Sequence, residues 1–300
     1  MTCIRKTMAF ITIFFLIFSM AGCAAKRADF APEGVDSDRP VIYTTFYPLY
    51  DFTKKIAGDK AQVESIIPAG VEPHDFEPSP RQIAEIYDAR VFVFLGGDME
   101  PWAQKLEGQL RGRGITVVEA GKDLIENHDP HIWLDPVLAK EMALRIYEAV
   151  ASADAGNKSY YEENFNKLAS GLDELDKNYR ENLSDLNKKD FITSHEAFGY
   201  MAKRYGLRQI SIKGLSPQEE PSPKKMADLA ELCRQKDIKY IFFETLASPK
   251  LSETLAREVG ARTMVLNPID GLTPEEIKAG ADYFSIMQKN LENLKKALSE

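Results

Sequence analysis

Short apolar runs alternate with amphipathic segments along the first half of the chain, which is the rhythm of parallel β/α units. Runs rich in β-branched and aromatic residues predict strands at 41–46, 62–67, 91–95 and 115–118. Segments with apolar residues every three or four positions predict helices at 49–57, 80–88 and 100–110. Strands and helices that alternate in this way predict an α/β lobe with a mostly parallel sheet over residues 41–155.

A second series of the same kind fills the last third of the chain. It predicts strands at 191–194, 208–212, 240–243 and 263–266, and helices at 196–205, 222–236, 249–259 and 274–298. Thr273 precedes Pro274 and is a plausible N-cap for the final helix. We expect residues 188–300 to form a second α/β lobe.

One long amphipathic segment separates the two series. After a helix predicted at 137–153, apolar residues recur in steps of three and four from Tyr161 to Leu186, the spacing of one helix face. A helix over about 158–187 would be on the order of 45 Å long at 1.5 Å per residue. We expect residues 156–187 to connect the lobes and leave a cleft between them. A coiled-coil dimer helix is the alternative, but its outer positions show no charge register, so we expect a monomer.

The first 22 residues are typical of a signal peptide. Arg5 and Lys6 precede an apolar run at 8–20, which is too short to span a bilayer comfortably. Small residues then stand before Cys23 as in a bacterial lipobox, with Met20 in place of the usual Leu. We expect cleavage after Gly22, lipid on Cys23, a flexible tether at 23–40, and an extracytoplasmic protein anchored to the cell membrane. An ordinary secretory signal with an incidental cysteine is the alternative.

The composition indicates a protein of globular domains and argues against nucleic acid as a partner. A chain of 300 residues with 44% hydrophobic and 28% charged residues is long enough for two globular domains. Its formal charge of -8 and the lack of a basic stripe argue against a nucleic-acid surface. Of the three cysteines, Cys3 lies in the signal peptide and Cys23 is the lipidation site, so we expect Cys233 to be a buried hydrophobe without a disulfide partner.

Three of the four histidines lie on turns with restricted backbones. His131 stands in Asp129-Pro130-His131-Ile132-Trp133-Leu134-Asp135-Pro136, His74 lies between two prolines in Pro73-His74-Asp75-Phe76-Glu77-Pro78, and His195 follows a predicted strand directly. Ligands of open α/β sheets bind outside the carboxyl ends of strands, and His74 and His195 both follow strands. We expect these three imidazoles to converge on one metal ion. His128 is expected to be a solvated loop residue, because Pro130 breaks the helix that would align it with His131.

Three imidazoles would leave a tetrahedral zinc ion one further position, although neutral imidazole also suits copper, nickel and iron. Asp270 and Glu244 are the candidate fourth ligands, because each stands at or just past the end of a predicted strand. Water in that position would leave the site open. Glu77, Asp135 and Glu196 lie beside the predicted ligands and could orient the imidazoles through their second ring nitrogens.

Enzyme signatures are not found. His195-Glu196 begins like the zincin motif, but Gly199 takes the place of the second histidine. No phosphate-binding loop, nucleophile elbow or Cys-x-x-Cys pair is present. A zinc-dependent hydrolase with water as fourth ligand and Glu196 or Glu244 as general base is the enzymatic alternative.

The segments around the three histidines resemble signature segments of the cluster A-I (TroA-like) solute-binding lipoproteins of bacterial ABC importers, within their zinc-uptake branch. These segments are Gly70-Val71-Glu72-Pro73-His74-Asp75-Phe76-Glu77-Pro78-Ser79-Pro80, His131-Ile132-Trp133-Leu134-Asp135-Pro136 and Ser194-His195-Glu196-Ala197-Phe198-Gly199-Tyr200. The resemblance runs from about Val41 to the C-terminus. It implies two α/β lobes, a rigid connecting helix, and one metal ion between the lobes. That ion would be delivered to a membrane permease powered by a cytoplasmic ATPase.

Carried over by residue, the resemblance implies that His74, His131 and His195 are ligands. Manganese binders of the family usually have Glu at the third position, so His195 implies zinc as the transported ligand. Many zinc-branch members have Asp before a proline near the last strand, where this chain has Asn267. A related subgroup has Asn-Pro-Leu-Glu there, and Asp270 matches its Glu. The His-rich loop of many zinc members is missing, since residues 119–130 hold only His128.

We therefore expect an extracytoplasmic lipoprotein that captures zinc and has no catalytic activity. Manganese or iron as cargo in the same fold is the first alternative. An adhesin with a structural metal site is another, suggested only by the surface location.

Overall fold

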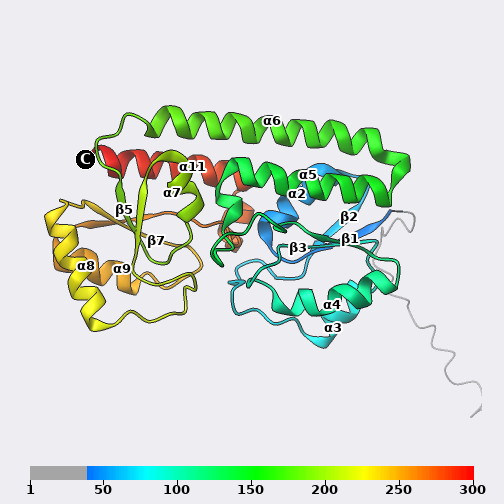
Figure 1. Cartoon of the computed structure of the whole chain (residues 1–300), viewed down its shortest axis with the longest axis horizontal. Coiled ribbons are helices and arrows are strands. Elements are labelled where there is room, and N and C mark those ends of the chain that lie inside the picture. Colours follow the sequence, from blue (N-terminus) through cyan, green and yellow to red (C-terminus); the bar gives the residue numbers. More distant parts are fainter. Residues whose placement is uncertain (1–38) are drawn as a thin grey trace, which may run out of the picture. The chain divides into compact units, whose positions relative to one another are not determined.

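Two parallel four-stranded sheets organise the computed structural model, in the orders β2-β1-β3-β4 and β6-β5-β7-β8 (Figure 1). The structure describes residues 39–300, which form one unit. The predicted signal peptide, Cys23 and nearly all of the predicted tether lie outside the described residues. Below, N-terminal lobe means residues 41–155 and C-terminal lobe means residues 188–300.

In the N-terminal lobe, helices cover both faces of the first sheet. The strands are β1 (Val41–Thr44), β2 (Gln62–Ser65), β3 (Val91–Phe94) and β4 (Thr116–Glu119). The helices are α2 (Tyr47–Ala57), α3 (Pro80–Ile86), α4 (Pro101–Gly112) and α5 (Pro136–Ala153). All four residues of β3 are buried, as expected for a central parallel strand with helices on both faces. Helices α2 and α5 pack on one face, and the side chains of α3 and α4 join a separate apolar cluster on the other.

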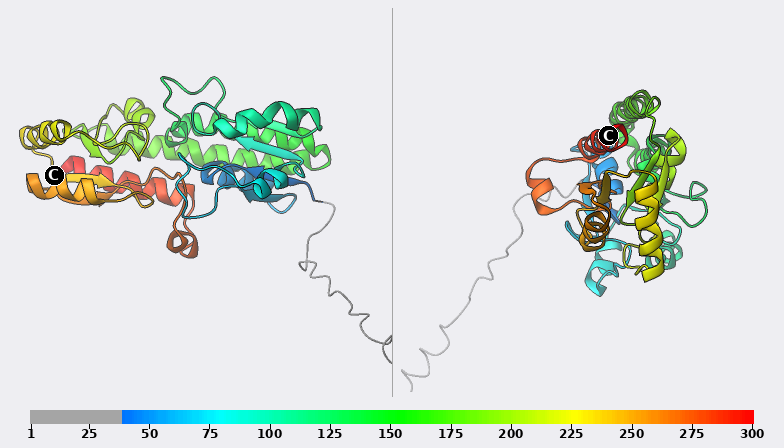
Figure 2. Two further views of the ribbon diagram at one scale, coloured as in Figure 1. Left: turned by 90° about the horizontal axis from the view of Figure 1, so that it is seen from below. Right: turned by 90° about the vertical axis from the view of Figure 1, so that its left-hand side faces the viewer.

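The C-terminal lobe repeats this strand order. Its strands are β5 (Asp190–Thr193), β6 (Arg208–Ser211), β7 (Tyr240–Phe243) and β8 (Arg262–Val265). Its helices are α7 (Gly199–Tyr205), α8 (Pro223–Gln235), α9 (Lys250–Val259), α10 (Pro274–Lys278) and α11 (Tyr283–Ser299). Helices α8 and α9 cover one face of the sheet, and α11 packs on the other (Figure 2). Cys233 is buried in the cluster beneath α8, as predicted.

The long helix α6 (Lys158–Leu183) packs against α2 and α5 on one side and against α7 and α11 on the other. It buries one apolar stripe: Tyr161, Leu168, Leu172, Leu175, Tyr179 and Leu183. This stripe belongs to a buried cluster that continues into both lobes, where it includes Phe46 and Phe242. The helix ends four residues before the predicted position 187, and Lys189 Nζ donates to the carbonyl oxygens of its last turn at 2.9 Å. A shared core therefore ties the two lobes to one rigid element.

The predicted single helix over 274–298 is wrong. The chain leaves helix α10 at Ala279, and Gly280 takes a left-handed φ of 72°. Asp282 then accepts from the backbone N–H of Ser285 and begins α11 with a new capping box. Helix α7 also begins at Gly199 rather than at the predicted residue 196.

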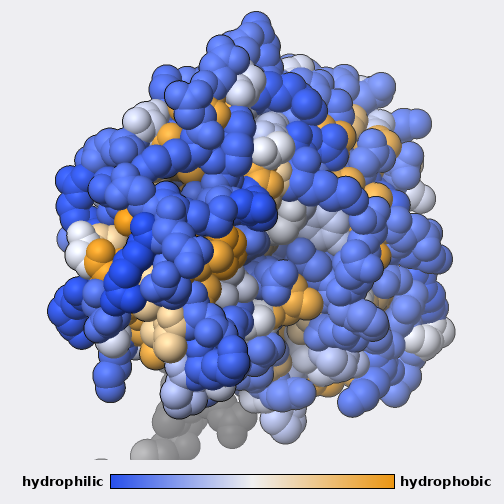
Figure 3. Space-filling view, turned by 60° about the vertical axis from the view of Figure 1, so that its left-hand side comes forward, coloured by the Kyte–Doolittle hydropathy of each residue, from blue (hydrophilic) through white to orange (hydrophobic). Residues whose placement is uncertain are grey.

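The face of the molecule seen in Figure 3 is mostly hydrophilic, with small scattered apolar areas. Among the described residues, the exposed large hydrophobic side chains are Val71 and Ile277. The helices of residues 39–300 include none long and apolar enough to cross a membrane.

Candidate metal centre

His74 lies on the loop that follows β2. The turn is closed by the Phe76 N–H, which donates to the Pro73 carbonyl at 3.1 Å. The His74 N–H donates to Glu72 Oε1 at 3.1 Å, and the capping box of Ser79 begins α3 shortly afterwards. The backbone on both sides of this imidazole is therefore held by local hydrogen bonds.

His131 is fixed by Asp129. Its backbone N–H donates to Asp129 Oδ1 at 3.0 Å, and its ring Nδ1 lies 2.8 Å from the same oxygen. An Nδ1–H that donates to this carboxylate leaves the Nε2 lone pair free for a metal. Trp133, two residues on, donates from Nε1 to the carbonyl of Pro268 in the C-terminal lobe at 2.7 Å. The turn that carries His131 is thus tied to the opposite lobe.

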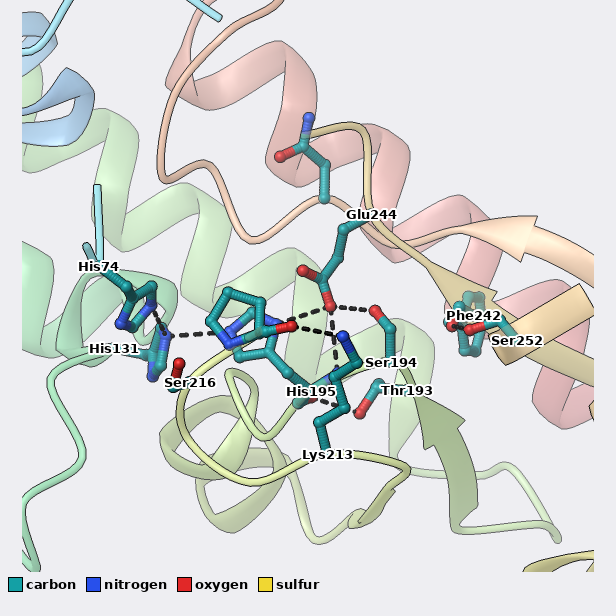
Figure 4. A network of polar contacts seen from close by, with 12 residues as sticks. His74, His131, Thr193, Ser194, His195, Lys213, Ser216, Phe242, Glu244 and Ser252 are labelled. Carbon is teal, nitrogen blue, oxygen red and sulfur yellow. Dashed lines mark hydrogen bonds and ion pairs between the residues drawn. The ribbon is translucent and has the colours of Figure 1, made fainter. Parts of the chain in front are cut away.

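His195 follows β5 and is fixed by Glu244, which directly follows β7. Glu244 Oε1 lies 2.7 Å from His195 Nδ1 and 3.2 Å from the His195 backbone N, and it accepts a short hydrogen bond from Ser194 Oγ. The His195 carbonyl accepts from Thr193 Oγ1 at 2.7 Å and from Gln209 Nε2 at 2.9 Å. Figure 4 shows the imidazole turned from this network towards the other two histidines.

The three imidazoles meet between the lobes. His131 Nε2 lies 3.2 Å from His74 Nε2 and 3.2 Å from His195 Nε2 (Figure 4). One ligand atom from each of the three lies within 4.8 Å of the other two. Zinc bonds of about 2.0–2.1 Å in a tetrahedron separate neighbouring nitrogens by roughly 3.3 Å. The spacing of these nitrogens therefore fits one zinc ion.

The Glu244 carboxylate separates the pKa of His195 from those of the other two imidazoles, although burial acts to lower the pKa of all three. Burial lowers the pKa of His74 to about 3, with repulsion from the other two imidazoles adding to the effect. Burial also lowers the pKa of His131 well below its usual value. Burial acts in the same direction on His195, but the Glu244 carboxylate outweighs it and raises the pKa of His195. His195 is thus the only one of the three imidazoles whose pKa is raised rather than lowered.

Asp270 lies on the loop after β8, and its side chain is 4% exposed. Its Oδ1 has no hydrogen-bond partner, and burial raises its pKa well above the usual value. One of its oxygens lies within 4.8 Å of ligand atoms of Glu72 and His74. Glu244, the other predicted candidate, instead lies behind His195 on the Nδ1 side.

The residues predicted to orient the imidazoles occupy other places. Glu77 and Glu196 are exposed, and Asp135 pairs with Arg204 at 2.6 Å while it caps α5 through the Val137 N–H. Asp129 and Glu244 take the Nδ1 positions instead. The sequence places Asp129 and Asp135 on either side of His131, and spacing alone does not distinguish them. His128 is exposed over 82% of its side chain and pairs with Asp98, in agreement with a solvated loop residue.

Helix α7 connects the lobes beside this site. Tyr200 Oη accepts from the Glu126 N–H at 2.6 Å and donates to the Asp129 carbonyl at 3.0 Å. Lys203 pairs with Glu126 at 2.9 Å on the exposed side. The loop that holds His131 is therefore in direct contact with the lobe that holds His195.

Two parallel α/β lobes on one long helix, with a triad of inward-facing imidazoles between them, define a metal-binding solute-binding protein. The family model for the zinc-uptake complex component A, periplasmic, matches residues 42–297. The chain belongs to this family of zinc-binding components of ABC zinc-uptake systems, which are not enzymes.

Two relatives of known name are similar to this chain over most of its length. The high-affinity zinc uptake system protein ZnuA of Bacillus subtilis is 41% identical over 95% of this chain and 94% of the relative. The zinc-binding lipoprotein AdcA of Streptococcus pneumoniae is 41% identical over 86% of this chain, which spans 56% of that relative.

Solved structures share the fold. The Zn(II)-bound ZnuA-like domain of Streptococcus pneumoniae AdcA is 42% identical, with a TM-score of 0.79 over 87% of this chain and 100% of that domain. The laminin-binding protein Lmb of Streptococcus agalactiae, described as a bifunctional protein with adhesin and metal transporting activity, is 33% identical, with a TM-score of 0.80 over 86% of this chain and 99% of that one.

Proposed function

We propose that this protein captures zinc outside the cytoplasmic membrane through His74, His131, His195 and Asp270. It then delivers the ion to the permease of an ABC importer, whose ATPase works in the cytoplasm. The observation that carries this proposal is the pair of 3.2 Å distances from His131 Nε2 to the Nε2 atoms of His74 and His195. Two of these imidazoles come from one lobe and the third from the other, so a bound ion would hold the lobes together.

The donor set supports zinc over manganese. Three neutral nitrogen donors favour zinc, copper, nickel or iron, whereas manganese prefers sites dominated by oxygen. The solved relative that is 42% identical holds Zn(II). Asp270 would complete a tetrahedron with one oxygen. Glu244 is the weaker candidate for that place, because its carboxylate already contacts His195 Nδ1 and Ser194 Oγ.

The shared core predicts a small change on binding. Helix α6 packs on helices of both lobes, and Trp133 and Tyr283 add hydrogen bonds across them at 2.7 and 2.6 Å. A large hinge rotation would break this core. We therefore expect apo and zinc-loaded protein to give nearly the same X-ray scattering curve.

Cys23 would carry the lipid that holds the protein on the outer face of the cell membrane. The signal-peptide pattern of residues 1–22 supports this, as does the lipoprotein relative AdcA. The largely hydrophilic face in Figure 3 and the few exposed large hydrophobics of residues 39–300 support a monomer.

Calorimetry on chelator-stripped protein tests the function. Zinc should bind far more tightly than micromolar at neutral pH, and manganese and iron should not displace it. His131→Ala should lose most of this affinity, whereas His128→Ala, which removes an exposed histidine three residues away, should change it little. Binding no tighter than micromolar, or equal affinity for the two variants, would refute the proposal.

A further inference from the structure

The described residues hold two overlapping groups of metal-ligand atoms. One is the imidazole triad, and the other consists of Glu72, His74 and Asp270, whose ligand atoms all lie within 4.8 Å of one another. His74 belongs to both groups. An ion could therefore pass from one group to the other while His74 stays bound.

Two members of the second group, Glu72 and Asp270, line a small space between them. A cavity of about 10 Å³ is lined by the acidic residues Glu72, Asp270 and Glu244, and its wall also includes the polar residues Thr245 and Asn267. A space of this size holds about one water molecule or one ion. Asp270 Oδ1 is buried there without a hydrogen-bond partner, an arrangement that costs free energy unless a ligand compensates it. A cation bound by Glu72 and Asp270 would supply that partner.

The exposure of the ligands indicates that the site opens to solvent on the side of His74 and the second group. His131 and His195 are both 0% exposed, whereas His74 is partly exposed. Asp270 also lines a larger surface cavity of about 470 Å³, which includes Glu64 and Tyr50. Asp270 thus lies between this surface cavity and the small cavity at Glu72.

Gln218 covers the second group from the C-terminal lobe. Its Nε2 donates to Glu72 Oε2, while Glu72 Oε1 accepts from the His74 N–H at 3.1 Å. Gln218 lies on an exposed loop, so its amide can leave without disturbing the core. Its departure would free one oxygen of Glu72 for a cation.

We propose that Glu72, His74 and Asp270 form a second cation position, which zinc occupies on its way between solvent and the three imidazoles, with Gln218 as its cover. This inference rests on the zinc-binding function proposed above. A position on the route lowers the barrier in both directions, because it replaces lost hydration with a carboxylate before the imidazoles are reached. It changes the association and dissociation rates together and leaves the equilibrium affinity nearly the same.

Stopped-flow zinc exchange with the whole protein tests this position. Glu72→Gln should lower both rate constants by about tenfold, because it removes one charge from the route. Gln218→Ala should raise both rate constants, since it removes the cover and keeps the charge. If the hydrogen bond between Gln218 and Glu72 only held the lobes together, both variants would change the rate constants in the same direction. Glu77→Gln removes an exposed acid from the same loop and is the matched control for general attraction of cations.

Unchanged rates in Glu72→Gln, or equal slowing by Glu77→Gln, would overturn the second position. Weak zinc binding by the wild-type protein would instead refute the proposed function, so the two failures are distinguishable. Crystals of the His131→Ala/His195→Ala variant soaked in zinc give an independent readout. An anomalous peak between Glu72 and Asp270 is expected, and its absence would overturn the proposal.

Discussion

Glu100 in the N-terminal lobe and Glu244 in the C-terminal lobe occupy matching places at the carboxyl edges of the two sheets. Each accepts a short hydrogen bond from the hydroxyl of the residue that directly follows the central strand, Thr45 after β1 and Ser194 after β5. The next residue differs between the lobes, because Phe46 stands where the other lobe has His195. The same carboxylate position therefore meets an imidazole in one lobe and none in the other.

The difference reverses the protonation of the two glutamates. Burial raises the pKa of Glu100 to about 7, although the Thr45 hydroxyl and the backbone N–H groups of Gly96 and Leu95 oppose it. Burial acts in the same direction on Glu244, but His195 and the hydrogen bond from Ser194 outweigh it and lower the pKa of Glu244. The N-terminal lobe thus offers two imidazoles that resist protonation, and the C-terminal lobe offers one that attracts a proton.

Removing one of the zinc-binding imidazoles, such as His195, should cause the largest loss of zinc affinity. A four-ligand zinc site with a binding free energy of about 10–16 kcal/mol loses roughly 2.5–4 kcal/mol with one ligand, or about 10²- to 10³-fold in affinity. His195→Ala and His131→Ala should both show this loss at pH 8.

Only His195→Ala should also change the pH dependence of zinc affinity. The pKa of His195 is raised above its usual value of 6.5. As pH falls through this raised pKa, the metal-free protein takes up a proton on His195, and zinc must displace that proton to bind. Below that pKa this proton alone costs about tenfold in affinity per pH unit. Competition titrations at pH 5–8 should show one proton fewer displaced in His195→Ala than in His131→Ala. Equal slopes would contradict the assignment.

Replacing Asp129 or Glu244, the carboxylates that orient His131 and His195, by the isosteric amide should cause the next largest loss of zinc affinity. Loss of a carboxylate that orients a metal-bound histidine typically costs about 10–100-fold in metal affinity. We expect losses in this range for both Asp129→Asn and Glu244→Gln at pH 8. Only Glu244→Gln should also move the affinity curve to lower pH, because it removes the charge that raises the pKa of His195. A parallel shift in Asp129→Asn would show that the two lobes titrate alike.

Glu100→Gln should alter stability rather than binding. The folded state holds a proton on Glu100 up to about pH 7, whereas an unfolded glutamate loses it near 4.5, so the stability from the neutral acid is lost as pH rises from 4.5 through 7. This shift corresponds to about 3 kcal/mol. Urea unfolding at pH 5 and pH 8 should therefore give a smaller difference in unfolding free energy for the variant than for the wild type. An unchanged difference would mean that Glu100 is ionised in the folded protein.

The contacts of α7 should have the smallest effects. Tyr200→Phe removes the hydrogen bonds that join α7 to the loop of His131 and should cost about 0.5–1.5 kcal/mol of stability. Lys203→Met removes an exposed ion pair on the same helix and should cost between 0 and about 1 kcal/mol. Thermal unfolding of the two variants checks this order, which a larger effect of Lys203→Met would reverse.

The apolar pattern predicted both sheets and the long helix, and the neighbouring prolines predicted the turns of His74 and His131, because each of these depends on local sequence. The apolar pattern failed at 274–298, where the apolar spacing continues past Gly280 although the backbone turns left-handed there. The sequence contained the signal for this break, since Gly280 is followed by the N-cap Asp282.

The partners of the imidazoles could not be predicted in the same way. Glu244 reaches His195 only because β5 and β7 are neighbours in the sheet. The local sequence of these two strands does not determine that they are neighbours. Glu72 meets Asp270 across nearly two hundred residues of sequence, because the loops after β2 and β8 face each other between the lobes. Such contacts depend on how the two lobes are held by α6.

Diffraction from zinc-loaded crystals at the zinc absorption edge tests the central claim most directly. The account predicts a strong anomalous peak about 2.0–2.1 Å from Nε2 of His74, His131 and His195, with Asp129 and Glu244 still on the Nδ1 atoms of the last two. A peak bound to fewer than three of these imidazoles, or bound through Nδ1, would contradict it.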